Sequence, residues 1–397
     1  MSREISPSEK RRLTSIRGRL EELDLGQNHI TQISGLSSLP SLKKLTLGKW
    51  ILTWSRLPSN IRVDGNLLQS IALTDNGDQV SSNLETVYLE NNLLETLDLS
   101  TCPSLRYVDI DQNRLRRITG LESLQKLDTL SIRKQDLAGS QASVISSILQ
   151  TTLHCRSLYL SSNTIPSLES MAAHHSIENF EAASCGLTTL PADFGLKFPN
   201  LRTLNLNFNT IKDPRPLLNI LPLEDLHIAG NRLSRLRKSV ATLAKLTKIR
   251  TLDIRDNPLT HGFYPPSTPT RTVSQALTCR STPKHQRTRS VEQQESRMQA
   301  YVLPAADVKV DDEHLGRLDE DSKLRRRVNE LLLANSCKKL QNMDGLVFDR
   351  ERLMKRDGIF DRLVKLGIIK KTSGDDKVGV CEKEVEDLAQ RTQDLHV

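Results

Sequence analysis

One nine-residue phrase recurs along most of the chain: an apolar residue, usually leucine, at the first, fourth and sixth places and asparagine at the ninth. Clear copies begin at Leu20, Leu84, Leu105, Leu201, Leu223 and Ile249, and weaker copies begin at Leu42, Leu127, Cys155 and Ile177. The copies follow one another at steps of about 22 residues, a period that is typical of solenoids. Because one such unit cannot bury its own apolar face, we expect neighbouring units to stack.

The phrase has a specific physical basis. Its apolar places belong to a short strand and the approach to it, and they point inward, while each strand pairs in parallel with the next. The asparagine lies where the chain leaves the strand, and its amide can satisfy buried backbone groups of adjacent turns. This is the leucine-rich repeat signature. It predicts an α/β solenoid with a parallel concave sheet, a helical or irregular convex side and a C-terminal helical cap. Cys185 is a tolerated replacement for the asparagine, whereas Trp50 predicts a bulge in the second repeat.

The step between the copies at 42 and 84 is about twice the normal period. We therefore expect one further repeat between them, in one of two registers. One uses Leu68, Ile71, Leu73 and Asn76, and the other uses Ile61, Val63 and Asn66.

Length and charge narrow the class of protein. The chain has 397 residues, a net charge of +8 and 4% aromatic residues, which suits a core of layered leucine and isoleucine. Residues 265–298 contain six Arg or Lys and two Glu, a net charge of 6 − 2 = +4, so half of the excess lies in one Ser/Thr/Pro-rich segment. We interpret this segment as a solvated tether, which makes nucleic acid an unlikely partner. No apolar run approaches the roughly 20 residues of a membrane span.

The six cysteines are scattered, and Met1 is followed by charged residues rather than a secretory leader. Reduced thiols and a cytosolic or nuclear location are therefore expected.

The chain divides into five predicted segments. Residues 1–19 form either a short helix that begins at the Ser6–Glu9 capping box or the severed tail of an earlier repeat. Residues 20–264 are repeats, with a convex helix at 143–153. Residues 265–298 are a disordered basic linker inserted in the last repeat. Residues 299–371 are the closing repeat and helical cap, with a helix at 318–334, a short strand near Met343 and a further helix from Phe348 to Leu366. Residues 372–397 are a polar tail.

No catalytic constellation, metal site or cofactor motif stands out, so we predict that the protein is not an enzyme. His174-His175 is interpreted as a solvated loop pair, and Asp109 and Asp111 as solvated charges of the concave face. Arg325 to Arg327 are interpreted as the solvated face of a helix, in preference to a nuclear-import or phosphate-binding cluster.

The concave strand face is where solenoids usually bind partners. Exposed tyrosine and arginine are residue types that anchor protein interfaces. The candidate protein-binding residues are Tyr88, Arg106, Tyr107, Arg133, Arg156, Tyr159, Arg202, Phe208, His227 and Arg255. The alternative is that each packs on its neighbour along the ladder and only stabilises it. In the linker, Thr268, Thr282 and Ser290 are candidate phosphorylation sites that would lower the local positive charge.

The block from Ile249 to Asp349 is more distinctive than the repeats. Its run IRTLDIRDNPLTHGFYPP, a polar insert, and LDEDSKLRRRVNELLLANSCKKLQNMDGLVFD resemble the leucine-rich domain of fungal spindle-pole-body scaffolds related to animal centriolin. The resemblance covers about residues 20–371. It implies a docking module, held to a spindle-pole anchor, for the septation initiation or mitotic exit network. In that family a long N-terminal region recruits kinases and a small GTPase module. Because almost nothing precedes the first repeat here, the resemblance does not carry this recruitment over to the chain, although kinase or GTPase pathway components remain candidate partners. The same observation supports the severed-repeat interpretation of residues 13–16.

Two other classes of function are considered. A regulatory subunit that wraps a phosphatase or another enzyme is the main alternative. A GTPase-activating solenoid fits less well, because such repeats are longer.

Overall fold

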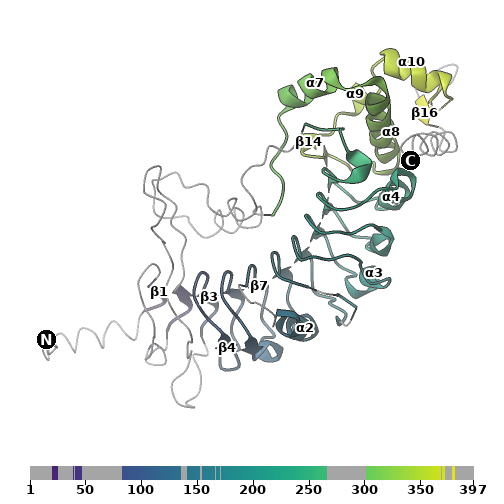
Figure 1. The fold of residues 1–397 in the computed structure, drawn as a ribbon. Helices are drawn as coiled ribbons and strands as arrows, with labels where there is room; N and C mark the ends of the chain where they lie inside the picture. The colour runs from purple at the N-terminus through teal and green to yellow at the C-terminus, as the bar shows by residue number, and fades with distance from the viewer. Residues whose placement is uncertain are drawn as a thin grey trace, which may run out of the picture. The chain divides into compact units, whose positions relative to one another are not determined.

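The computed structural model describes residues 20–25, 39, 41–46, 83–135, 141–152, 154–165, 167–169, 171–265, 301–367, 369–371 and 378–380. The chain divides into two compact units, which we describe separately (Figure 1). Unit 1 contains the described residues up to Cys185 except 167–169. Unit 2 contains residues 167–169 and the described residues from Gly186 onward.

Unit 1 is a ladder of short parallel strands. They are β1 (Glu22–Asp24), β2 (Lys44–Thr46), β3 (Thr86–Tyr88), β5 (Tyr107–Asp109), β7 (Thr129–Ser131), β8 (Ser157–Tyr159) and β9 (Asn179–Glu181), paired in this order. The central residue of each strand points inward, and Leu45, Val108 and Leu158 are fully buried. The predicted parallel solenoid with an apolar interior is therefore confirmed.

The other side of unit 1 is irregular, as predicted. The strands β4 (Thr96–Asp98) and β6 (Arg117–Thr119) form a second, two-stranded parallel sheet, and a 3-10 turn η2 spans Leu121–Ser123. The predicted helix at 143–153 is confirmed as α2 (Gln141–Thr151), shifted by two residues. It lengthens the repeat that it belongs to.

The repeat expected between residues 42 and 84 contributes no strand to the ladder. Strand β2 pairs directly with β3, with Lys44 opposite Thr86 and Leu45 opposite Val87. No strand can lie between two strands that are hydrogen-bonded to each other, so the expectation of an intervening ladder strand was wrong. Both proposed registers, and Trp50, fall outside the described residues.

Unit 2 continues the same repeat. Its parallel strands are β10 (Thr203–Asn205), β11 (Asp225–His227), β12 (Thr251–Asp253) and β13 (Asn342–Met343), and β14 (Leu346–Val347) pairs antiparallel with β13. The other side carries α3 (Phe194–Lys197), η3 (Arg215–Leu217), α4 (Leu236–Leu243) and η4 (Pro258–Thr260). Strand β12 pairs in parallel with β13, although about 90 residues separate them in sequence, which is the pairing that an insert in the last repeat requires.

Asp344 closes the ladder. In the other turns of unit 2 the backbone N–H at this place donates to a carbonyl of the next strand, as Leu206 donates to His227. After β13 the chain turns away, and the Ile254 N–H donates instead to Asp344 Oδ1 at 2.7 Å. A side chain thus satisfies a buried donor that would otherwise lack a partner.

The cap consists of four helices. They are α7 (Val308–Arg317), α8 (Glu320–Ser336), α9 (Arg350–Leu353) and α10 (Gly358–Lys365). An aspartate N-caps each one through backbone N–H groups: Asp307, Asp319, Asp349 and Asp357. The predicted helix at 318–334 is confirmed as α8, whose Leu324, Val328 and Leu331 form a buried cluster with the helices that follow it. The expectation of one helix from Phe348 to Leu366 was wrong, because Asp357 begins a new helix. Helix α7 was not predicted.

Beyond the cap, β15 (Ile369–Lys371) and β16 (Val378–Val380) form an antiparallel pair. Residues 1–19, the predicted linker apart from Pro265, and the predicted polar tail apart from β16 lie outside the described residues.

The asparagine ladder has the predicted role. Asn231 Nδ2 donates to the carbonyls of Leu206 at 2.9 Å and Ile228 at 3.1 Å, and its Oδ1 accepts the Ile211 N–H at 3.0 Å. One side chain therefore satisfies backbone groups from two adjacent turns. Cys185 replaces the amide with a thiol, a weak donor that contacts the carbonyls of Leu160 and Ala183, both at 3.4 Å.

The residue before this place is left-handed in every described repeat from β3 to β12. These residues are Asn91, Gln112, Lys134, Ser162, Ser184, Phe208, Gly230 and Asp256, with φ between 50° and 64°. A left-handed residue costs about 1–2 kcal/mol when it is not glycine. We infer that the amide in the next position stabilises a turn that most of these residues would not adopt alone.

We predict that Asn231→Ala lowers the free energy of unfolding by about 4 kcal/mol, because four buried backbone groups each lose a partner at roughly 1 kcal/mol. Urea denaturation measures this value. Cys185→Ala is the matched control at the same repeat position, and its loss should be clearly smaller, since a thiol is a weak hydrogen-bond donor. Equal losses for both variants would contradict the role of the amide.

Candidate functional site

The ten candidate binding residues do not form a single surface. They occupy three places relative to the strands. Tyr88, Tyr107, Tyr159 and His227 are outward residues of strands; Arg133, Phe208 and Arg255 follow a strand; and Arg106, Arg156 and Arg202 immediately precede one. The three places differ in burial and in bonding.

The outward tyrosines of β3 and β5 form a pair. The ring centroids of Tyr88 and Tyr107 lie 5.0 Å apart with an interplanar angle of 43°. The ammonium of Lys44 lies 6.0 Å from the Tyr88 centroid. Both rings are half-buried. The sequence prediction that these rings lie on the outward side of the strands is consistent with this arrangement, and they offer an aromatic patch on the concave face of unit 1.

Arg133 is buried, not exposed as the sequence suggested. Its guanidinium binds the Glu181 carboxylate in two places, at 2.6 Å and 3.1 Å, and lies 4.5 Å from the centroid of Tyr159. Asp111 Oδ1 accepts the Arg133 backbone N–H at 2.6 Å and Asp109 is buried, so the interpretation of these two aspartates as solvated charges was wrong. Only 6% of the Arg133 side chain is exposed. Arg133 and Tyr159 therefore pack along the ladder, and burial raises the pKa of Tyr159 to about 12.

From β1 to β12, the residue just before each strand of the two ladders carries a charge whose sign alternates. In unit 1 the row is Glu21, Lys43, Glu85, Arg106, Asp128, Arg156 and Glu178, and in unit 2 it is Arg202, Glu224 and Arg250. Neighbouring strands lie about 4.8 Å apart, so equal charges would repel along such a row.

Several neighbours in this row form ion pairs. Arg156 lies 3.6 Å from Asp128 and 3.5 Å from Glu178, and Arg250 lies 3.2 Å from Glu224. Each such pair contributes at most about 1 kcal/mol, because the side chains are solvated. Arg106, Arg156 and Arg202 are exposed, as predicted. They do not lie on the strands but just before them, in a row that also contains carboxylates. The alternation is visible in the sequence once the repeats are aligned.

Phe208 stabilises the next turn. It has left-handed backbone with φ 59°, and its ring packs against Gly230. A Cβ atom at Gly230 would lie 2.7 Å from the Phe208 ring, so only glycine allows this approach. Phe208 is half-buried and belongs to the packing of the ladder.

The concave face of unit 2 is bonded to a later part of the same chain. Asn205 and Asn207 donate to the Tyr301 carbonyl at 3.2 Å and 2.9 Å. Arg255 donates to the Pro304 carbonyl at 3.0 Å, and Asp253 holds the same guanidinium at 3.0 Å and 2.6 Å. We call residues 301–306 the strap; it leads into α7 (Figure 1). Arg255 is thus buried rather than exposed.

Asp344 is fully buried beside this face. Burial, and then the charge of Asp253, raise the pKa of Asp344 to about 7. Tyr264 and Arg255 also face the carboxyl group. Its neutral form is therefore favoured below about pH 7, because burial and the Asp253 carboxylate outweigh the opposing charge of Arg255.

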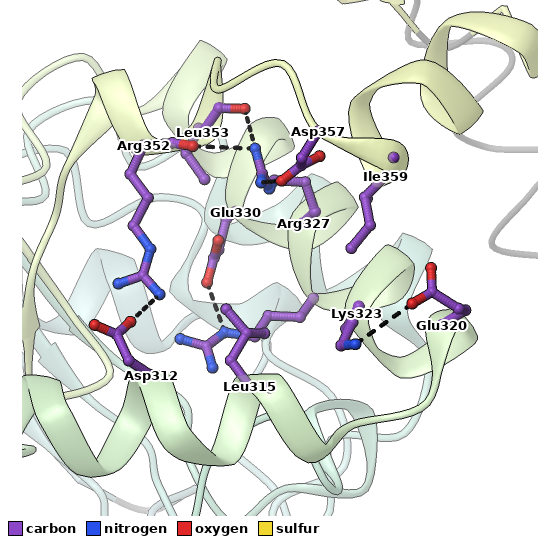
Figure 2. A pocket seen from close by; sticks show the side chains of 13 residues that line it. Asp312, Leu315, Glu320, Lys323, Arg327, Glu330, Arg352, Leu353, Asp357 and Ile359 are labelled. Carbon is purple, nitrogen blue, oxygen red and sulfur yellow. Dashed lines mark hydrogen bonds and ion pairs between the residues drawn. The ribbon is translucent and has the colours of Figure 1, made fainter.

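A cavity of about 410 Å³ lies in the cap between α7, α8 and the start of α10 (Figure 2). Its cations are matched by carboxylates: Arg327 with Asp357 at 2.8 Å, Arg352 with Asp312 at 2.6 Å, Lys323 with Glu320 at 3.4 Å and Arg326 with Glu330 at 2.9 Å. The cavity therefore has no excess of positive charge toward an anion.

The interpretation of Arg325 to Arg327 as a solvated face was wrong for Arg327, whose side chain is 13% exposed and bonded to Asp357, and for Arg326. The Arg326 guanidinium binds buried Asp311 in two places, at 2.9 Å and 2.8 Å, and donates to the Phe263 carbonyl at 2.8 Å. The apolar pattern of α8 did not reveal the Arg326–Asp311 ion pair, because Asp311 belongs to α7, a helix that we did not predict from the sequence.

The side chains of His174, Cys155 and Cys185, which could be reactive, are buried in the core of the ladder. His174 is buried between the carbonyls of Leu149 and Thr152, so the solvated loop pair was wrong for this residue. Burial raises the pKa of Cys155 and of Cys185 to about 12, which leaves both thiols protonated.

Within the part of the chain that the structure describes, no group of three or more His, Cys, Asp or Glu residues is placed to hold a metal ion. None of the described helices is long and apolar enough to span a bilayer.

Comparison with known proteins gives three kinds of match. A family model described as leucine-rich repeats (2 copies) matches residues 19–59. The septation initiation network scaffold protein cdc11 of Schizosaccharomyces pombe is 32% identical over 169 residues, which are 43% of this chain and 16% of that protein. An adenylate cyclase of the same species is 27% identical over 238 residues, 58% of this chain and 14% of that protein.

Among solved structures, the leucine-rich repeat domain of APL1B is 18% identical with a TM-score of 0.41, covering 65% of this chain and 75% of that one. The chain thus spans less than a fifth of the two curated relatives named above.

We predict that Arg133→Ala lowers the free energy of unfolding by about 3–5 kcal/mol, because it leaves the buried Glu181 carboxylate without its partner. Arg156→Ala, which removes an arginine that is 59% exposed, should change it by less than about 0.5 kcal/mol. Chemical denaturation of both variants measures the difference. A small effect at Arg133 would show that its buried pair is not needed.

We predict that Asp344→Asn flattens the pH dependence of thermal stability. Between the ordinary pKa of 3.8 and about 7, the folded chain holds a proton that the unfolded chain has lost. This contribution to stability is complete below pH 3.8 and is lost as the pH rises through 7. Asparagine keeps the acceptor for the Ile254 N–H but does not titrate. Melting curves from pH 5 to pH 8 measure the effect, and equal slopes for both proteins would refute it.

Proposed function

The chain is a leucine-rich-repeat protein, and on that premise we propose that it is a non-enzymatic docking module that holds septation-initiation or mitotic-exit signalling components at the spindle pole body. The observation that carries the proposal is the 32% identity to a septation initiation network scaffold over 43% of the chain. A scaffold requires a stable surface more than it requires reactive groups, and a stacked ladder provides one.

We assign docking to the concave face of unit 1. Tyr88 and Tyr107 supply an aromatic pair on β3 and β5, and Arg106 and Arg156 lie exposed just before β5 and β8. Aromatic and arginine side chains dominate the energy of many protein interfaces. The corresponding face of unit 2 is less suitable, because Asn205 and other outward residues are already bonded to the strap.

The proposal extends to partners and regulation. A spindle-pole anchor is the proposed partner, with kinase or GTPase pathway components as further candidates. Phosphate on Thr268, Thr282 or Ser290 would reduce the positive charge of the insert and alter such contacts. The similarity to an adenylate cyclase covers 14% of that protein, and we propose no cyclase activity for this chain.

We predict that the triple variant Arg106→Ala, Tyr107→Ala, Arg156→Ala loses spindle-pole localisation. Fluorescence of a tagged chain in dividing Schizosaccharomyces pombe measures it, and wild type should give discrete paired dots. Loss of interface anchors should lower the pole signal by about tenfold or more. Circular dichroism checks that the variant remains folded.

Arg202→Ala is the matched control. Arg202 precedes a strand of unit 2, and its side chain is 59% exposed, as is that of Arg156. It should localise like wild type. A diffuse wild-type signal together with a co-purified phosphatase would instead support a regulatory subunit that wraps an enzyme. Unchanged dots in the triple variant would reject the assigned face.

A further inference from the structure

The strap is recognised through its main chain. The Tyr301 carbonyl accepts two side-chain amide N–H groups, and the Pro304 carbonyl accepts one guanidinium N–H. The Ala306 N–H donates to the Gly345 carbonyl at 2.9 Å. Contacts of this kind read an extended backbone without regard to most side chains. The exception is the Tyr301 ring, which is 1% exposed and acts as an anchor.

The spacing of these contacts shows that the strap crosses the strands rather than pairing with one of them. Tyr301 is bound by residues of β10 and its exit, and Pro304 by a residue after β12. Two strand spacings are about 10 Å. Three extended residues also span about 10 Å. Three residues therefore suffice to reach from one set of donors to the next.

The donors are held in place by the ladder and not by the strap. Asn207 Oδ1 accepts the Ala229 N–H at 2.7 Å, and Asn205 Oδ1 accepts the Asn207 N–H at 3.1 Å. Arg255 is fixed by its bidentate pair with Asp253. Each side chain thus has one end bonded within the sheet and presents the other to the strap. A site built in this way is preorganised for a ligand.

Gly345 permits the close approach at the far end. Its φ is +80°, and a Cβ atom there would lie 2.9 Å from the Ala306 nitrogen and 2.8 Å from Arg255 Nη1. Any other residue would push the strap away or displace the arginine.

The strap is anchored independently beyond Ala306. Helix α7 is joined to α8 by the buried Asp311–Arg326 pair, and Arg352 binds Asp312 at 2.6 Å. His314 contacts the Gly262 carbonyl at 3.1 Å. Tyr301 can therefore leave the face while α7 and the cap stay in place.

From these contacts we propose that the concave face of unit 2 is a second peptide-binding site, which the chain fills in cis with its own strap. The ligand class is an extended peptide with an aromatic residue followed by proline three positions later. Such a peptide binds in trans when the strap is displaced. This site is separate from the docking face proposed for unit 1, so either assignment can fail without the other.

The test uses the full chain and a fluorescein-labelled peptide with the sequence of residues 300–307. Fluorescence polarisation measures binding. Wild type should bind weakly, because the strap competes at high effective concentration. Tyr301→Ala removes the buried anchor, and it should bind the peptide at least about tenfold more tightly than wild type.

Two further substitutions in the Tyr301→Ala background locate the peptide. Asn207→Asp keeps the acceptor for the Ala229 N–H but removes the N–H that binds the strap carbonyl, and it should weaken binding about tenfold or more. Asn179→Asp makes the same chemical change on a strand of unit 1, where Asn179 contacts Ser157, and it should leave binding unchanged.

Hydrogen exchange on the wild-type chain keeps the proposal testable if Tyr301→Ala fails to fold. Excess unlabelled peptide should speed deuterium uptake in residues 301–306 and leave the strands of unit 1 unchanged. The proposal is overturned if folded Tyr301→Ala does not gain affinity, if Asn207→Asp has no effect, or if excess peptide leaves exchange of the strap unaltered.

Discussion

The solenoid depends on one repeated interaction, in which a buried side-chain amide satisfies backbone groups of two adjacent turns. Each turn ends its strand with a left-handed residue, which leaves carbonyls and N–H groups inside the ladder. Asn231 and its equivalents bind these groups from both sides, so each turn requires its neighbour. Asp344 applies the same principle at the end of the ladder, where a carboxyl oxygen replaces the carbonyl of a strand that is not there.

The outward side of the strands serves different purposes in the two units. In unit 1, the aromatic pair Tyr88–Tyr107 lies near arginines whose charges alternate with carboxylates. In unit 2, the outward amides and Arg255 bind the strap. The alternating charges that precede the strands favour one order of stacking. If a turn stacked on the wrong neighbour, equal charges would lie side by side. While the strap is bound, it covers the concave face of unit 2 and blocks partners from binding there.

The fold was largely predictable because its determinants are local and periodic. The repeats, α2, α8 and the split of the last repeat by an insert all follow from apolar spacing and from residues such as Asn257 and Met343. Direct pairing of β2 with β3 was not predictable, since a degenerate sequence admits several registers. The candidate site was harder to predict from the sequence than the fold. Burial of Arg133 by Glu181 depends on residues 48 positions apart, and burial of Arg326 depends on a helix with little apolar pattern.

We propose that a partner docks on the face of unit 1, whereas the face of unit 2 holds the strap. Site-specific photo-crosslinking in cells, from benzoylphenylalanine placed at position 107 or at position 227, tests this directly, with adducts identified by mass spectrometry. The claim predicts an intermolecular adduct from position 107 and an adduct to residues 301–306 of the same chain from position 227. A partner captured from position 227, with none from position 107, would contradict it.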